Sequence, residues 1–283
     1  MNKIKDILRG VMIGIANIIP GVSGGTMMVS MGIYDTIIGC INNLFKDFKR
    51  CLATLWPFVV GMAVAIVGLS FVIEPLFEHF PLQTNCAFIG LIFGGLPVLL
   101  RRIKGKRKGI PGAAVFLLAF ALIIVLQILG EGNGASANVT LSVIEVVKLF
   151  AIGVIASATM VIPGVSGSMM LMLLGYYEPV ISSISGFIKA LAAFDMGALL
   201  HNVGILIPVG LGIVIGIFAI AKLIEILIAR WEGITYCAII GLVSASPIAI
   251  LMTVNWAQIS LLAVVVSALT FGVGYAVAYR LSE

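Results

Sequence analysis

Residues 17–26 read NIIPGVSGGT, and residues 160–169 read MVIPGVSGSM. The two copies lie 143 positions apart, so that Ser23 of the first corresponds to Ser166 of the second. Both copies are embedded in strongly apolar sequence, where Pro and Gly destabilise the interior of a helix. The repeated motif therefore predicts that a helix breaks at corresponding points in two halves of the chain.

The composition is that of a membrane protein. The 283 residues are 61% hydrophobic and 10% charged, with a mean hydropathy of +1.21, whereas soluble domains carry about 25% charged residues. Several long apolar runs predict an all-α polytopic membrane protein rather than a barrel. The four cysteines and two histidines show no metal-ligand spacing, so we expect no metal site and no cofactor.

Six apolar runs predict membrane spans across roughly 30 Å of hydrocarbon: residues 52–77, 84–100, 110–130, 202–228, 235–253 and 257–279. The two motif segments, about 6–44 and 143–190, differ because only about 13 apolar residues precede each break, too few to cross. We expect each motif segment to be a re-entrant hairpin of two half-helices that meet near the midplane. The second arm, 24–44 or 167–188, is nevertheless long enough for a full crossing.

Basic residues set the orientation. They flank the first motif segment on both sides, and residues 101–108 (RRIKGKRK) add six, whereas residues 131–142 have none. With these basic flanks in the cytoplasm, only Lys148 and Lys189 of the 17 basic residues lie outside. We therefore expect both termini in the cytoplasm and a second motif segment that enters from the outer side.

The repeat extends beyond the motif. Three further matches share one offset: residues 86–91 (CAFIGL) with 237–242 (CAIIGL), Pro57 with Pro208, and Glu74 with Glu225. We predict one membrane domain, residues 1–283, built from two inverted-topology repeats, residues 1–130 and 143–283. Each repeat would hold a re-entrant helical hairpin and about three transmembrane helices.

The broken segments form a candidate anion site. Glycines permit close approach of a ligand, and the start of the following helix offers unpaired N–H groups and a partial positive charge that suit a phosphate. Packing hinges made of small residues are the alternative. The predicted phosphate-binding residues are Ser23, Gly24, Gly25, Thr26, Ser166, Gly167 and Ser168, with Asn17 and Arg9 as weaker additions.

Four acidic residues are candidates for ion coupling: Asp35, Glu178, Glu74 and Glu225. Asp35 and Glu178 end the two motifs, where a position at the water interface explains them equally well. Lys222 precedes Glu225 by one helical turn, a spacing typical of a structural ion pair. The tyrosines beside the motifs, Tyr34, Tyr176 and Tyr177, are predicted to anchor the chain at the membrane interface.

The paired motifs resemble the bacterial polyprenyl-phosphate transporter family, formerly a domain of unknown function. The resemblance covers essentially the whole chain and rests on Arg9-Gly10 and on residues 16–26, 32–35 and 162–178. It implies a translocase of the bacterial cytoplasmic membrane that returns undecaprenyl phosphate from the outer to the cytoplasmic leaflet. Many members carry Asp where this chain has Asn17; if that Asp moves a proton in them, this chain must couple differently.

The implied transport requires a driving force. Inward movement of a negative charge against an inside-negative potential costs roughly 2.3 kcal/mol per 100 mV, so we expect proton or sodium coupling.

Two other functions stay open. An undecaprenyl-diphosphate phosphatase has a similar motif that continues with Arg-Ser, but Gly24 and Gly167 stand there, and Ser23 lacks an evident activator. A small-anion channel or exchanger could use the same helix ends. We expect a transporter rather than an enzyme; the sequence leaves its oligomeric state open.

Overall fold

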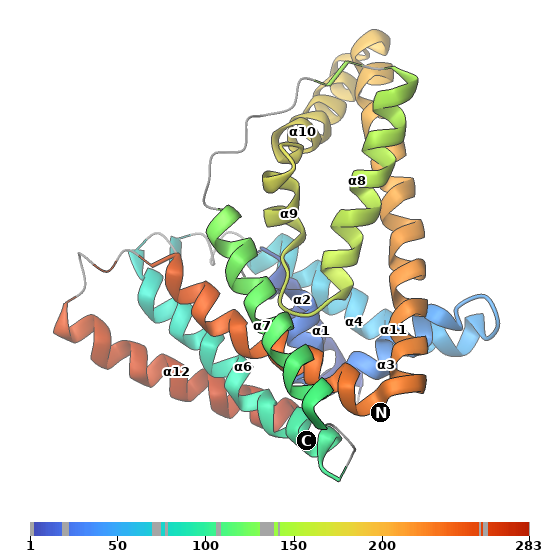
Figure 1. Cartoon of the computed structure of the whole chain (residues 1–283). Helices are drawn as coiled ribbons and strands as arrows, with labels where there is room; N and C mark the ends of the chain where they lie inside the picture. The colour runs from blue at the N-terminus through green and yellow to red at the C-terminus, as the bar shows by residue number, and fades with distance from the viewer. Residues whose placement is uncertain are drawn as a thin grey trace.

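The computed structural model describes residues 3–18, 23–69, 75–76, 79–105, 109–130, 139–140, 142–254, 256 and 260–282. In these residues the chain is built from helices (Figure 1). Five helices are long and apolar enough to cross a membrane, or seven if each of two bent helix pairs is one span. The all-α, polytopic fold class is thereby confirmed, whereas the inversion of the repeats and their boundaries stay predictions.

Each motif segment consists of three helices rather than two. The first contains α1 (Lys3–Ile18), α2 (Gly24–Ser30) and α3 (Tyr34–Asn42), and the second contains α8 (Val143–Val161), α9 (Gly167–Leu173) and α10 (Tyr177–Ala193). The chain bends by 116° between α2 and α3 and by 111° between α9 and α10.

Glycine makes both bends possible. Gly32 has φ 68° and Gly175 has φ 77°, in the left-handed region that other residues rarely adopt. These two glycines are also 143 positions apart. The prediction that each second arm is a single helix was therefore wrong. Each arm begins with one short helix and then bends at a glycine that occupies the same position in both copies.

The helix before the second motif is longer than predicted. α8 has 19 residues and is one of the five candidate spans, so it is long enough to cross, whereas α1 has 16 residues and is not among them. Ser142 caps α8 by accepting a hydrogen bond from the Glu145 N–H at 3.2 Å. Lys148 lies 3.2 Å from the Glu145 carboxylate, so α8 accommodates both charges in its first turns.

The remaining helices supply the scaffold: α4 (Phe48–Val64), which continues as the π-helix η1 (Ala65–Leu69), α6 (Pro81–Ile103), α7 (Gly109–Gly130), α11 (Met196–Met252) and α12 (Leu261–Ser282). α11 is two helices, because Trp231 has non-helical angles. We call residues 196–230 its first arm and residues 232–252 its second arm. They cover the predicted span 202–228 and, up to Met252, the predicted span 235–253. The predicted span 52–77 is helical to Leu69, and residues 70–74 lie outside the described residues.

The start of α6 and the start of the second arm of α11 have the same local geometry. Phe80 has φ −133° and ψ 52°, and Trp231 has φ −137° and ψ 52°. Thr84 Oγ1 donates to the carbonyl oxygen of Phe80 at 2.8 Å, and Thr235 Oγ1 donates to that of Trp231 at 2.9 Å. Each threonine hydroxyl also lies within 3.1 Å of the carbonyl oxygen eight residues earlier. The corresponding residues are 151 positions apart, so the sequence repeat has a structural counterpart here.

Glycines bring the motif helices close to the scaffold at corresponding points. A Cβ atom on Gly61 of α4 would overlap the carbonyl oxygen of Ile7 in α1, and one on Gly212 of α11 would overlap that of Phe150 in α8. The two halves also interlock: α12 packs on α6, and α7 packs on α11. The last helix of each predicted repeat thus contacts the other repeat.

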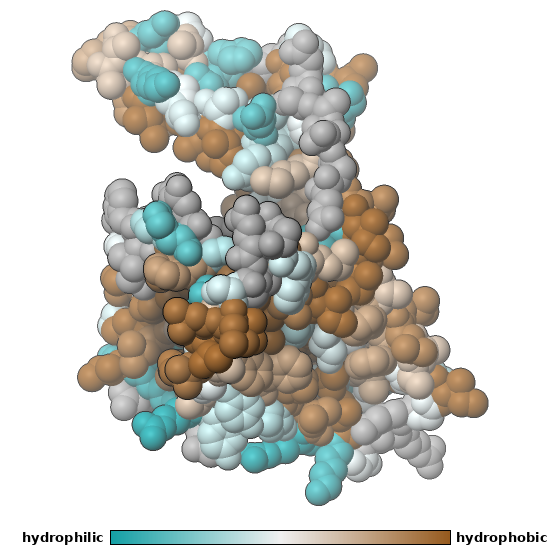
Figure 2. Space-filling view, turned by 90° about the vertical axis from the view of Figure 1, so that its left-hand side faces the viewer, coloured by the Kyte–Doolittle hydropathy of each residue, from teal (hydrophilic) through white to brown (hydrophobic). Residues whose placement is uncertain are grey.

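The surface fits a membrane setting. Figure 2 shows brown, hydrophobic residues over the middle of one face, with most of the teal, hydrophilic residues toward the top and the bottom. Apolar side chains such as Leu118, Leu269 and Val273 are between 65% and 71% exposed, as lipid-facing side chains are. Both termini lie at the same end of the molecule (Figure 1), and Arg9 of α1 donates to the Leu281 carbonyl of α12.

The glycine crossing between α8 and α11 gives a direct test. We expect Gly212→Ala to lower the free energy of unfolding by about 1–3 kcal/mol, because the added methyl group must push two backbones apart. Gly210→Ala is the matched control, because a Cβ at Gly210 meets no atom within 4 Å. Unfolding in detergent measures both; equal stability of the two variants would contradict the close crossing.

Candidate functional site

The two repeated motifs meet at their tips. The backbone N–H of Gly164 donates a hydrogen bond to Thr26 Oγ1 at 2.7 Å. A Cβ atom on Gly25 would lie 3.2 Å from the Pro163 backbone, so the two segments of the chain pack closely here. Thr26 is fully buried, and Pro163 is less than 2% exposed. Residues separated by more than 130 positions are therefore joined at one buried point between the halves.

The first tip is formed by the start of α2. Ser23 is its N-cap, and Ser23 Oγ accepts the Gly25 N–H at 3.2 Å, which leaves the hydroxyl hydrogen free of that bond. Ser23 is only 4% exposed. Asn17 covers the tip from α1, since a Cβ on Gly24 would lie 2.5 Å from Asn17 Oδ1. Residues 19–22, with Pro20 and Gly21, lie outside the described residues.

The second tip is formed by the start of α9. Ser166 is the N-cap, and its hydroxyl shares a hydrogen bond with that of Ser168 at 2.8 Å. A Cβ on Gly167 would lie 3.3 Å from the side chain of Met160. Met160 corresponds to Asn17, and Gly167 corresponds to Gly24, so the same covering contact is polar at one tip and apolar at the other.

The two tips are electrically neutral. The chain carries no charged residue between Arg9 and Asp35 or between Lys148 and Glu178. The structure does not bring Arg9 to the tips. Its guanidinium is 3.0 Å from Asp6 and donates to the Leu281 carbonyl, and along α1 it lies about 13 Å before Ile18. The tips therefore present hydroxyl and N–H dipoles rather than charged side chains of the motif segments.

Asp35 and its neighbours attach α3 to the second half of the chain. Asp35 Oδ2 accepts a hydrogen bond from the Tyr236 hydroxyl at 2.6 Å, and the Tyr34 hydroxyl donates to the Val161 carbonyl at 3.1 Å. The prediction that Tyr34 anchors the chain at the membrane interface was wrong. Tyr34 is only 4% exposed, and its hydroxyl bonds to the carbonyl of the last residue of α8. Nothing in the sequence marked Tyr236 as a partner, because the pairing joins positions 201 residues apart.

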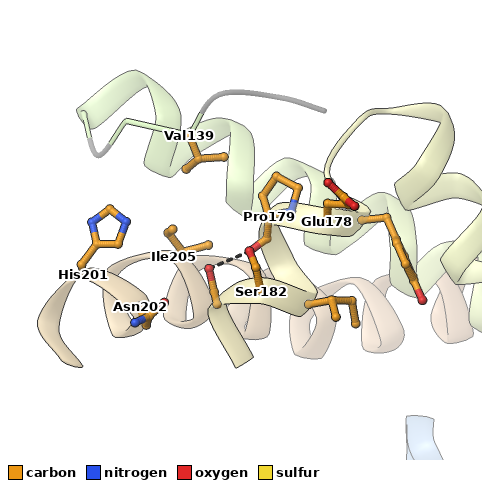
Figure 3. Close-up of a pocket in the computed structure, with 10 residues that line it drawn as sticks. Val139, Glu178, Pro179, Ser182, His201, Asn202 and Ile205 are labelled. Atoms are coloured by element: carbon orange, nitrogen blue, oxygen red, sulfur yellow. Dashed lines mark hydrogen bonds between the residues drawn. The ribbon is translucent and has the colours of Figure 1, made fainter. Parts of the chain in front are cut away.

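Glu178, the counterpart of Asp35, has a different environment. It is exposed and lines a cavity of about 540 Å³ between α10 and α11, together with Tyr177, His201 and Asn202 (Figure 3). Its carboxylate makes no hydrogen bond or ion pair with the described residues. The other acidic candidates are less informative: Glu225 pairs with Lys222 at 2.8 Å, and Glu74 lies outside the described residues.

Broken helices that meet inside an apolar helical bundle define a class of multi-pass membrane proteins, in which such breaks typically form a transport site. The chain belongs to the undecaprenyl phosphate translocase-like family, whose model matches residues 13–206 and therefore includes both tips.

Two curated relatives are each named polyprenyl-phosphate transporter. The one from Staphylococcus aureus is 31% identical, over 87% of this chain and 85% of its own length. The one from Vibrio cholerae is 27% identical, over 86% of this chain and 75% of its own length. No solved structure matches this chain.

The Thr26 contact generates a prediction. Thr26→Val keeps the shape of the side chain but leaves the buried Gly164 N–H without its acceptor, which costs about 1–3 kcal/mol. We expect this loss in unfolding measurements, together with weaker association of the two halves after a cut between them. Thr26→Ser keeps the acceptor and is the matched control; a valine variant as stable as the serine variant would contradict a structural role for this bond.

Proposed function

We propose that this protein moves undecaprenyl phosphate, or a similar polyprenyl phosphate, from the outer to the cytoplasmic leaflet of the bacterial cytoplasmic membrane. The observation that carries the proposal is the buried junction of the two tips, where Gly164 donates to Thr26. Membership of the translocase-like family and the names of the two relatives support this substrate class.

The proposed headgroup site consists of the two tips. Ser23, Gly24, Gly25 and Thr26 supply one side, and Ser166, Gly167 and Ser168 supply the other, with Asn17 at the edge. A phosphate needs several donors, and these residues offer hydroxyl and backbone N–H groups without a fixed positive charge. A neutral site favours transport because a carrier must also release its anion, which a buried Arg or Lys would oppose. The polyprenyl tail can stay in the lipid beside the bundle.

Coupling to a cation would balance the charge of the lipid. Moving one negative charge inward costs roughly 2.3 kcal/mol per 100 mV, and a co-transported proton or sodium ion offsets this cost. Among the four acidic candidates, Asp35 and Glu178 are the best placed, because they directly follow the two bends and occupy different environments. Asp35 is hydrogen-bonded between the halves, whereas Glu178 faces a cavity.

The competing functions are less well supported. A phosphatase would need a group that activates Ser23 or Ser166, and the chain around both serines carries no charged residue or histidine from position 10 to 34 or from 149 to 177. A channel or exchanger for small anions would use the same neutral donors, so the assay must distinguish it.

The test uses purified protein in sealed vesicles that contain labelled polyprenyl phosphate and polyprenyl diphosphate. We expect accelerated leaflet exchange of the monophosphate without release of phosphate, and a rate that responds to a proton or sodium gradient. Phosphate release from the diphosphate would instead indicate the phosphatase. Chloride or carboxylate flux without lipid exchange would indicate the small-anion transporter.

The serine hydroxyls can be tested separately. Ser23→Ala with Ser166→Ala removes one donor from each tip; because a hydrogen bond to a charged group contributes about 1.5–3 kcal/mol, we expect exchange to fall roughly a hundredfold with folding intact. Ser185→Ala with Ser282→Ala is the matched control, since these hydroxyls donate only to carbonyls of their own helices. A rate of lipid exchange in the tip variant equal to that of the unchanged protein would contradict this site assignment.

A further inference from the structure

The two halves repeat one sequence pattern, but their third motif helices are placed differently. α3 crosses to the other half: Tyr34, Asp35 and Asn42 bond to Val161, Tyr236 and the Ala221 carbonyl. α10 packs on α11 within its own half, where Asn202 lies against Gly186. No hydrogen bond joins α10 to the described residues of the first half, and in Figure 1 α10 lies at the top of the view, well separated from α6.

The repeat identifies the residues of the first half that correspond to the partners of α3. The matching breaks at Phe80 and Trp231, each followed by a threonine that bonds back across it, align residues 84–87 (TNCA) with residues 235–238 (TYCA). Asn85 therefore stands where Tyr236 stands. In the same way Glu178 corresponds to Asp35, and both lie directly after a tyrosine.

Both counterparts lack the bond that their equivalents make. Asn85 is only 4% exposed, yet its amide forms no hydrogen bond within the part of the chain that the structure describes. The amide atoms of Asn85 are not among the fully buried, unpaired polar atoms of the described residues, so a new partner can still reach them. Glu178 is exposed and equally without a described partner. A donor and an acceptor at equivalent positions are thus both vacant, while Asp35 and Tyr236 are joined at 2.6 Å.

We propose that the protein has a second conformation in which the Asn85 amide donates to the Glu178 carboxylate and the Tyr177 hydroxyl donates to the Ile18 carbonyl. The Asp35–Tyr236 and Tyr34–Val161 bonds are broken in that conformation. Two of the three bonds that α3 makes to the second half are exchanged for two bonds made by α10, which limits the difference in hydrogen bonding between the two conformations. Asn85 and Glu178 are therefore positioning residues for the conformation that is not seen here.

The exchange between the two conformations would drive the proposed transport. Only this link to transport rests on the proposed function. With the orientation that the basic residues predict, α3 lies on the cytoplasmic side, bonded to the second half, and Glu178 lies on the outer side, where it lines the 540 Å³ cavity (Figure 3). In the second conformation α10 closes the outer side and frees Asp35. The joined tips would then face each side of the membrane in turn, as alternating access requires.

Paired cysteines test the exchange. Cys40, Cys51, Cys86 and Cys237 are first replaced, because Cys86 and Cys237 adjoin the test positions. One variant carries Asn85→Cys with Glu178→Cys, and a second carries Asp35→Cys with Tyr236→Cys. A protease site inserted within residues 131–138 separates the members of each pair, so that a disulfide holds the two fragments together on a non-reducing gel.

We expect the 35–236 pair to cross-link rapidly without lipid and the 85–178 pair to cross-link when polyprenyl phosphate is added. Each disulfide should stop lipid exchange reversibly. The matched control, Asn85→Cys with Ser185→Cys, places the second cysteine two turns further along α10 and should not cross-link. An 85–178 rate no higher than this control, with and without lipid, overturns the proposal. An 85–178 cross-link in protein that moves no lipid would support the conformational exchange while refuting the proposed substrate.

Single substitutions provide a second readout in case the cysteine variants fail to fold. Glu178 is exposed, so replacing it should not unfold the protein. We expect Glu178→Ala to slow lipid exchange without an ion gradient at least tenfold, and Glu178→Gln, which keeps an acceptor for the Asn85 amide but not the acid proposed for coupling, to slow it less. Equal rates for alanine and glutamine variants would overturn the role of Glu178 as an acceptor.

Discussion

The fold depends on how the backbone groups that helix breaks leave unpaired are hydrogen-bonded inside an apolar helical bundle. Every helix break frees N–H and carbonyl groups, and lipid cannot bond them, so irregular backbone survives at membrane depth only where protein encloses it. Here the described residues of the two tips contact each other. Thr26 accepts the Gly164 N–H, the Tyr34 hydroxyl bonds to the carbonyl at the end of α8, and glycine crossings hold the motif helices against α4 and α11. The polar junction is thus a structural joint, and it is the site proposed for a polar ligand.

The neutrality of that junction distinguishes it from a tight anion site. A buried cation would bind a phosphate strongly and hold it, because separating paired charges in a medium of low dielectric constant is costly. Dipolar donors bind an anion more weakly and can also satisfy one another, as the Ser166–Ser168 hydrogen bond illustrates. The charged residues are kept at the far ends of the motif segments, where Asp35 and Glu178 contact the scaffold or water instead of the tips.

The sequence predicted most of the elements and few of the contacts. Apolar length located the spans, and the Pro-Gly pairs located the breaks, because both signals are local. The second bend at Gly32 and Gly175 was missed, since a single glycine after an apolar run does not distinguish a turn from a close packing contact. Tyr34 was assigned to the interface for the same reason: an aromatic residue beside a helix end is typical there, and its bond to Val161, 127 positions away, has no local signal. The roles of the tip residues stay predictions.

The differences between the two copies are as informative as the matches. A repeated sequence pattern does not by itself require that both copies adopt one arrangement, and here Asn17 is matched by Met160, Thr26 by Met169, and Tyr236 by Asn85. A perfectly symmetric pair would place equal contacts at both ends and would have no preferred resting state. Unequal residues at equivalent positions bias one arrangement, in which α3 is bonded to the other half and α10 packs on α11 in its own half, without removing the partners of the other arrangement. A site that opens to only one side of the membrane cannot act as a carrier. The balance between these two sets of bonds, rather than either set alone, would let the same site open to each side in turn.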